Sequence, residues 1–61
     1  MSLVRIGNEK IIAACNIHLQ NFFISDKIKE ALEKLRAKAK DNFESSINLS
    51  DHDFLLIKDY L

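Results

Sequence analysis

The residue types best suited to chemistry are one cysteine and two histidines. Cys15 and His18 are three residues apart, as neighbours on one helix face would be, and His52 lies between Asp51 and Asp53. A structural zinc site needs four ligands, and here the fourth could only be a carboxylate beside His52. Nucleophilic catalysis by Cys15 with His18 as base would need a third, orienting group, and the sequence offers none. We therefore expect no catalytic residue, metal or cofactor, and interpret Cys15 as a buried apolar side chain.

Composition excludes several other classes of protein. The chain has 61 residues, enough for one small domain, 1–61, and its nine Lys and Arg balance nine Asp and Glu. A net charge of zero gives no general attraction to nucleic acid or anionic membrane. No apolar run reaches the roughly 20 residues of a membrane span, and no signal-peptide pattern is present. The single cysteine fits a reducing compartment, so we predict a cytoplasmic protein that is not an enzyme.

The elements that must position these residues are expected to be helices. Apolar side chains recur at helical spacing over about 8–23, 26–43 and 50–60. Residues 3–6 form either an extended arm or an early helical turn, and 44–51 form a connection. These segments predict an all-α fold, in which a helical hairpin is closed by a C-terminal helix.

Helix start signals support these boundaries. Asn8 and Ser25 or Asp26 are suitable N-caps for the first two helices. Ser50 is the N-cap of the third, with Asp53 three residues later as in a capping box. The apolar positions that these helices share predict a core of Ile12, Cys15, Leu19, Phe23, Ile28, Leu32, Leu35, Phe43, Phe54 and Ile57.

An uncharged segment, residues 11–25, suggests how the chain assembles. It contains no Lys, Arg, Asp or Glu, although the chain is 30% charged. On a helix it would present an apolar patch roughly opposite its core-facing stripe, and a helix apolar nearly all round is normally buried all round. Two other short helices cannot enclose it, so we expect a homodimer or higher oligomer, assembled as a homodimeric helical bundle. The expected interface residues are Ala13, Ile17, Gln20, Asn21 and Ile24.

These exclusions leave a small protein–protein interaction module, such as a regulator, inhibitor or adaptor, which acts as a homo-oligomer. Its size and composition suit a phage- or plasmid-type protein that binds another protein. Apolar residues that oligomerisation leaves uncovered would form the partner site, because an exposed apolar patch with a charged border is the usual form of one. The candidates are Phe22, Leu55, Leu56 and Tyr60.

The alternative is a dimeric nucleic-acid-binding transcriptional regulator that uses the basic flanks of the second helix. Five acidic residues in the same segment reduce the charge, no aromatics interleave with the bases, and no helix-turn-helix is evident. A ribbon-helix-helix dimer with residues 3–6 as its strand would fit the length, but the alternation is weak. The charge layout also occurs on helices that lie on membranes, although it is commoner in soluble bundles. The candidate nucleic-acid contacts are Lys27, Lys29, Lys34, Arg36, Lys38 and Lys40.

Overall fold

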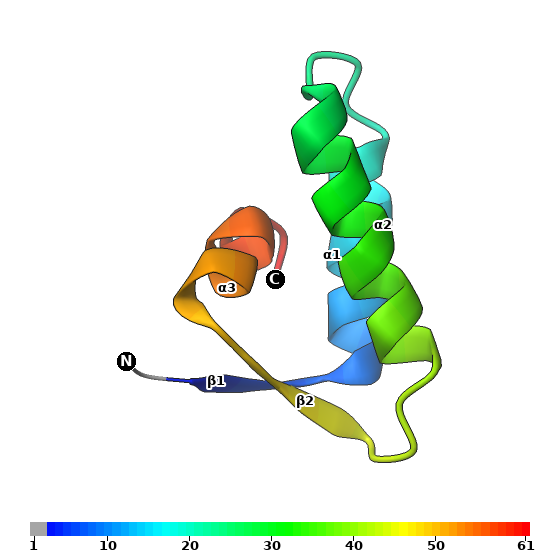
Figure 1. The fold of residues 1–61 in the computed structure, drawn as a ribbon, viewed down its shortest axis with the longest axis vertical. Helices are drawn as coiled ribbons and strands as arrows, with labels where there is room; N and C mark the ends of the chain where they lie inside the picture. Colours follow the sequence, from blue (N-terminus) through cyan, green and yellow to red (C-terminus); the bar gives the residue numbers. More distant parts are fainter. Residues whose placement is uncertain (1–2) are drawn as a thin grey trace.

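The computed structural model describes residues 3–61 and shows an α+β fold. The prediction of an all-α fold, and with it a purely helical bundle, is wrong, because two short strands pair in addition to the helices. Helices α1 and α2 pack side by side as the expected hairpin, and α3 lies to one side of it above the sheet (Figure 1). The elements are β1 (Val4–Gly7), α1 (Asn8–Leu19), α2 (Asp26–Lys40), β2 (Ser46–Leu49), α3 (Asp51–Ile57) and a 3₁₀ turn, η1 (Lys58–Tyr60).

The strands β1 and β2 form an antiparallel sheet from segments at opposite ends of the chain. Val4 pairs with Leu49 and Ile6 with Ile47, while Arg5 pairs with Asn48. Side chains alternate across a strand, so the apolar pairs share one face and the polar pair the other. The expectation left open for residues 3–6 is thus resolved as an extended segment, and the apolar face of the sheet covers the base of the helices.

Helix α1 ends at Leu19, four residues before the predicted end at residue 23. Asn21 explains the early end, because its side-chain oxygen accepts a hydrogen bond from the Phe23 N–H at 3.0 Å. Such a local side-chain bond offers the backbone an alternative to the helix. The residues that follow are aromatic or β-branched and are weak helix formers. Residues 20–25 therefore form a loop.

Helix α2 ends at Lys40, three residues before the predicted end at residue 43. The side-chain nitrogen of Asn42 lies 3.1 Å from Asn8 Oδ1 and 2.9 Å from the Ser46 carbonyl oxygen. Asn42 thereby ties the start of α1 to the start of β2, which requires the chain to leave the helix. The third helix begins as predicted, because Ser50 Oγ accepts a hydrogen bond from the Asp53 N–H at 3.4 Å.

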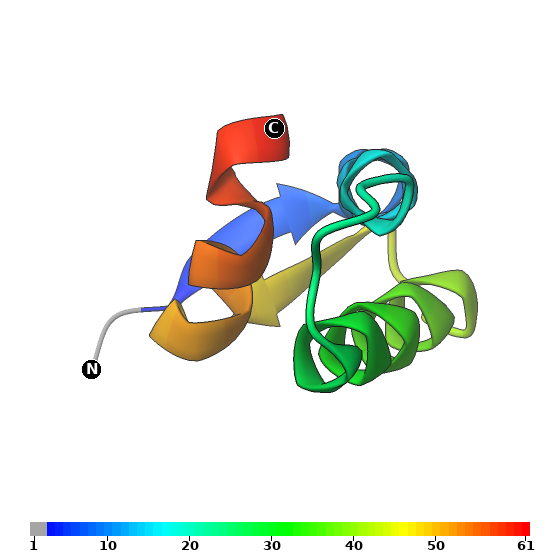
Figure 2. The same cartoon turned by 90° about the horizontal axis from the view of Figure 1, so that it is seen from above.

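The core lies where the hairpin, the sheet and α3 meet. Helix α1 is packed on two sides within one chain, by α2 and by α3 with η1, as the view along the hairpin shows (Figure 2). Phe23 and Phe43, which were expected in the core, are instead exposed in the two loops. Four expected core residues, Ile12, Leu19, Ile28 and Phe54, are half-buried against it. The buried residues are Ile6, Ile11, Ala14, Cys15, Leu32, Leu35, Ala39, Leu49 and Ile57.

Candidate functional site

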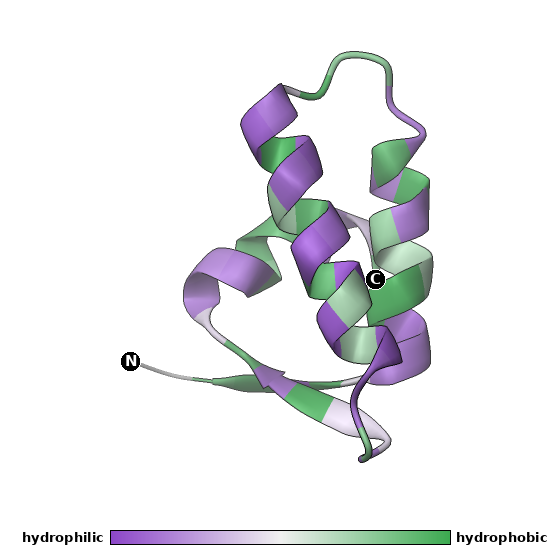
Figure 3. Cartoon of the chain, turned by 45° about the vertical axis from the view of Figure 1, so that its right-hand side comes forward, coloured by the Kyte–Doolittle hydropathy of each residue, from purple (hydrophilic) through white to green (hydrophobic). Residues whose placement is uncertain are grey.

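The loop between α1 and α2 presents two adjacent phenylalanines to solvent. Phe22 is 96% exposed and Phe23 95% exposed, at the end of the hairpin farthest from the sheet (Figure 1). Coloured by hydropathy, the top of this loop is apolar and lies between polar stretches on both sides (Figure 3). We call Phe22 and Phe23 the aromatic tip. It is the strongest candidate for a binding site, because two fully exposed aromatic side chains at consecutive positions contribute nothing to this chain's own core.

Hydrogen bonds at both ends hold the aromatic tip in place. On the α1 side, the Gln20 N–H donates to the Ile17 carbonyl at 3.2 Å, and the Asn21 N–H donates to the His18 carbonyl at 3.1 Å. On the α2 side, Ser25 Oγ accepts the Ile28 N–H at 3.3 Å and caps the helix. The backbone of a loop anchored in this way loses less conformational freedom on binding than that of an unanchored loop.

A third exposed phenylalanine lies at the opposite end of the hairpin. Phe43 is fully exposed in the loop between α2 and β2. It stands alone, beside the polar Asn42 and Glu44, and thus lacks the second aromatic side chain that makes the tip an apolar patch. Phe43 is therefore a natural control for the two phenylalanines of the tip.

The residues expected at an oligomer interface lie mainly on the surface of α1 and the loop. Ala13, Gln20 and Asn21 are exposed, and Ile17 is 51% exposed. Ile24 is half-buried and packs against the core. Because α2, α3 and η1 already cover two sides of α1, the uncharged segment leaves a smaller apolar surface than a lone helix would. Self-association through this face stays a prediction.

The residues expected to bind a partner do not share one environment. Phe22 is in the aromatic tip and Leu55 is 60% exposed on α3. Leu56 is half-buried against the core, and so is Tyr60, whose ring stacks on His18 with centroids 4.5 Å apart. Sequence reasoning missed Phe23, which it assigned to the core. The signal that could have found it is Asn21, a frequent loop residue, immediately before two aromatics.

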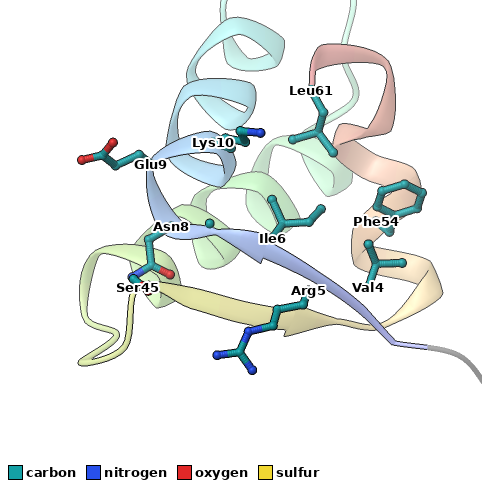
Figure 4. Close-up of a pocket in the computed structure, with 10 residues that line it drawn as sticks. Val4, Arg5, Ile6, Asn8, Glu9, Lys10, Ser45, Phe54 and Leu61 are labelled. Atoms are coloured by element: carbon teal, nitrogen blue, oxygen red, sulfur yellow. The ribbon is translucent and has the colours of Figure 1, made fainter.

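Besides the aromatic tip, the structure forms an open groove of about 790 Å³ along β1. Val4 and Ile6 line it from the strand, and Phe54 and Leu61 line it from the C-terminal part of the chain (Figure 4). The Arg5 side chain leaves the strand on the opposite side, where it forms an exposed ion pair with Glu44 at 3.5 Å. The groove thus combines an apolar lining with the outer edge of a strand. Sequence reasoning did not identify it.

The basic residues of α2 are divided between two sides of the helix. At about 100° per residue, the two rows lie roughly 180° apart, on either side of the buried stripe. Arg36 is committed to the hairpin, because it donates a hydrogen bond to Asn16 Oδ1 at 2.8 Å. No flat surface can contact both rows together. One row contains Lys27, Lys34 and Lys38, and the other contains Lys29, Arg36 and Lys40.

The residues considered for chemistry are separated in space or committed to structure. Cys15 is fully buried, and this burial raises the pKa of its thiol, although the nearby Arg36 charge lowers it in part. His18 Nδ1 is 2.9 Å from the Leu56 carbonyl oxygen and so links α1 to α3. His52 lines a small groove of about 220 Å³ with Lys34 and Lys38. Within residues 3–61, no three His, Cys, Asp or Glu side chains gather where they could hold a metal.

Comparison with protein-family models, with curated protein sequences and with solved structures gave no match to this chain. Across residues 3–61, no helix has both the length and the apolar character needed to cross a bilayer. Function is therefore inferred from the chain's own surfaces.

Proposed function

We propose that the protein is a small non-enzymatic interaction module, a regulator, inhibitor or adaptor, that binds another protein through the aromatic tip. One observation carries the proposal: Phe22 and Phe23 are adjacent and 96% and 95% exposed on a loop that is hydrogen-bonded at both ends. Aromatic anchors that fill a pocket are the residues on which interface energy concentrates.

The free energy available from the aromatic tip is large enough to matter. Burying one phenylalanine side chain gains about 1.5–3 kcal/mol, so a pocket that takes both gains roughly 3–6 kcal/mol. Each factor of ten in a dissociation constant corresponds to about 1.4 kcal/mol. The tip could therefore account for a hundredfold or greater preference for a partner with a matching pocket, a strength that suits an adaptor or inhibitor.

Two further parts of the proposal concern assembly and compartment. The module acts as a homo-oligomer, because a chain of this length buries only about 60% of the surface that its unfolded form exposes and gains stability from a second copy. It works in the cytoplasm, a location supported by Cys15, which is a free thiol rather than part of a disulfide.

The alternative, a nucleic-acid-binding regulator, has weaker support. The six bases of α2 are split into two opposed rows, and Arg36 is engaged with Asn16. Each copy could therefore offer a duplex one row of three bases at most, next to the acids Glu30 and Glu33 of the same helix.

The experiment compares capture of a partner by three forms of the protein. Tagged wild type, the double variant Phe22→Ser with Phe23→Ser, and the control Phe43→Ser are each incubated with lysate of the native cells. Each capture is run at about 0.1 M and 0.5 M salt, since added salt screens exposed charges, and with and without nuclease. All three phenylalanines are exposed, so none of the substitutions removes core packing.

The proposal predicts a protein that wild type and Phe43→Ser retain at both salt concentrations after nuclease treatment, and that the double variant loses. Loss of the bound protein with Phe43→Ser alone would contradict it. Recovery of nucleic acid that is released by salt and weakened by Lys34→Glu with Lys38→Glu would favour the regulator instead.

A further inference from the structure

The outer edge of β1 carries backbone groups that its sheet does not use. The Asn8 N–H donates to the Ser45 carbonyl at 2.9 Å, which continues the ladder beyond Gly7. Hydrogen-bonded and non-bonded pairs alternate along an antiparallel ladder. Arg5 and Gly7 therefore belong to the non-bonded pairs, and the N–H and C=O of Arg5 point away from β2, toward the outer edge.

The outer edge of β2 has hydrogen-bond partners at both of its ends. On β2, the Ser46 carbonyl accepts a hydrogen bond from Asn42 Nδ2 at 2.9 Å, and the Ser50 carbonyl after the strand accepts the Phe54 N–H at 2.9 Å. Proteins commonly blunt exposed edges with charges, proline, bulges or covering segments. In the part of the chain that the structure describes, β1 has no proline and no bulge and borders the open groove, where the charged lining residues besides Arg5 are Glu9 and Lys10 at the start of α1.

The groove beside β1 has the form that an extended chain would fill. Its apolar side chains, Val4, Ile6, Phe54 and Leu61, lie on the side of the strand that faces the core (Figure 4). An added strand would need apolar side chains on that side and polar ones on the other. Val4–Gly7 has this alternation itself, with Val4 and Ile6 on one side and Arg5 on the other.

We propose that a second copy of this chain occupies the groove, with the two β1 strands paired antiparallel across a two-fold axis to give a continuous four-stranded sheet. This proposal specifies the homo-oligomer of the proposed function and moves its interface from the face of α1 to the edge of the sheet. The two-fold relation is self-complementary, because each edge offers the same unused N–H and C=O groups to the other.

Charge selects the register of this pairing. A register centred on Arg5 would place the two arginines directly opposite each other, and like charges in that position are destabilising. A register centred on Ile6 places the two Ile6 side chains together over the core and sets Arg5 opposite Gly7 of the second copy. The Ile6-centred register is therefore the one we assign.

The four-stranded sheet fixes where the two aromatic tips of the dimer lie. Strands of one continuous sheet share their faces, so both helical hairpins rise from the same face of the four-stranded sheet. Both aromatic tips then project to one side, away from the interface. A dimer can hold two partner sites, and binding to both would exceed the affinity of one site without new contacts.

The test uses proline, which removes a backbone N–H. Arg5→Pro deletes an outward-pointing N–H on β1, and the matched control Asn48→Pro deletes its counterpart on the outer edge of β2. Arg5→Ala removes the charge and keeps the N–H. Sedimentation over a range of concentrations gives the dimer dissociation constant of each variant, and circular dichroism reports whether it is folded.

We expect wild type, Arg5→Ala and Asn48→Pro to dimerise with similar dissociation constants. Arg5→Pro should dimerise about tenfold or more weakly, because the substitution is present in both copies and the dimer loses two hydrogen bonds. Amide exchange of the wild type gives an independent readout if Arg5→Pro fails to fold. Exchange at Arg5 should slow as protein concentration rises, whereas exchange at Asn48 should not change.

Two results would overturn the inference. One is a monomer at every concentration with no protection at Arg5, which would also remove the homo-oligomer from the proposed function. The other is a dimer that Ile17→Asp abolishes and Arg5→Pro leaves intact, which would place the interface on α1. Neither depends on partner capture by the aromatic tip, so the failure of one proposal is distinguishable from the failure of the other.

Discussion

At the scale of single residues, Cys15 and His18 each take part in the packing of the fold. Cys15 is enclosed in the core, and His18 joins α1 to α3 through the Leu56 carbonyl and stacks on Tyr60. The lone thiol was predictable as a buried residue from its position in an apolar run, whereas the partners of His18 were not, because they lie on a distant segment.

Cys15 gives a pH prediction with a definite sign. Burial raises the pKa of its thiol in the folded state, so folding favours the protonated form. Above the ordinary pKa of a free thiol, the unfolded chain binds fewer protons than the folded one, and the free energy of unfolding falls as pH rises. We expect this alkaline fall in denaturant titrations of wild type and a shallower one in Cys15→Ala. Equal slopes for the two proteins would contradict the assigned cause.

At the scale of elements, the structure differs from the sequence-based prediction in two ways: α1 and α2 end earlier than predicted, and two strands are present. The α2 helix and the start of α3 were predictable, because a long periodic stripe and the Ser50 cap are local signals. Each strand has four residues, too few for alternation to be convincing, and their pairing joins distant segments. Of the two residues of the aromatic tip, Phe22 was predicted as a partner-binding residue, whereas Phe23 was predicted in the core. The helical spacing of apolar residues extends through Phe23, but the Asn21 hydrogen bond ends the helix before it.

Asn42 gives the prediction for the elements. Its side chain contacts Asn8 and the Ser46 carbonyl and so joins α1, α2 and β2. Asn42→Ala should lower the free energy of unfolding by about 1–3 kcal/mol, because partly buried groups lose their hydrogen-bond partner. Asn21→Ala is the control and should cost less than about 0.5 kcal/mol, since its bond to Phe23 is exposed. A smaller loss for Asn42→Ala than for Asn21→Ala in urea titrations would show that this junction is unimportant.

At the scale of the whole molecule, the two proposed surfaces lie at opposite ends. The chain extends 31 × 24 × 17 Å, with the aromatic tip at one end of its long axis and the sheet near the other (Figure 1). Substitutions at such distant sites normally act independently. Changes at the sheet edge should therefore alter assembly without altering the tip, and changes at the tip should alter partner binding without altering assembly.

The most direct test of partner binding through the aromatic tip uses the chain's four phenylalanines as reporters. Protein labelled with fluorophenylalanine gives one fluorine NMR signal for each, and single Phe→Leu variants assign them. In lysate of the native cells, the account predicts that the Phe22 and Phe23 signals shift or broaden. The signal of Phe43, which is equally exposed, should broaden only to the extent that the higher viscosity of the lysate broadens every signal. Unchanged Phe22 and Phe23 signals, or an equal change at Phe43, would contradict the claim that the tip is the binding site.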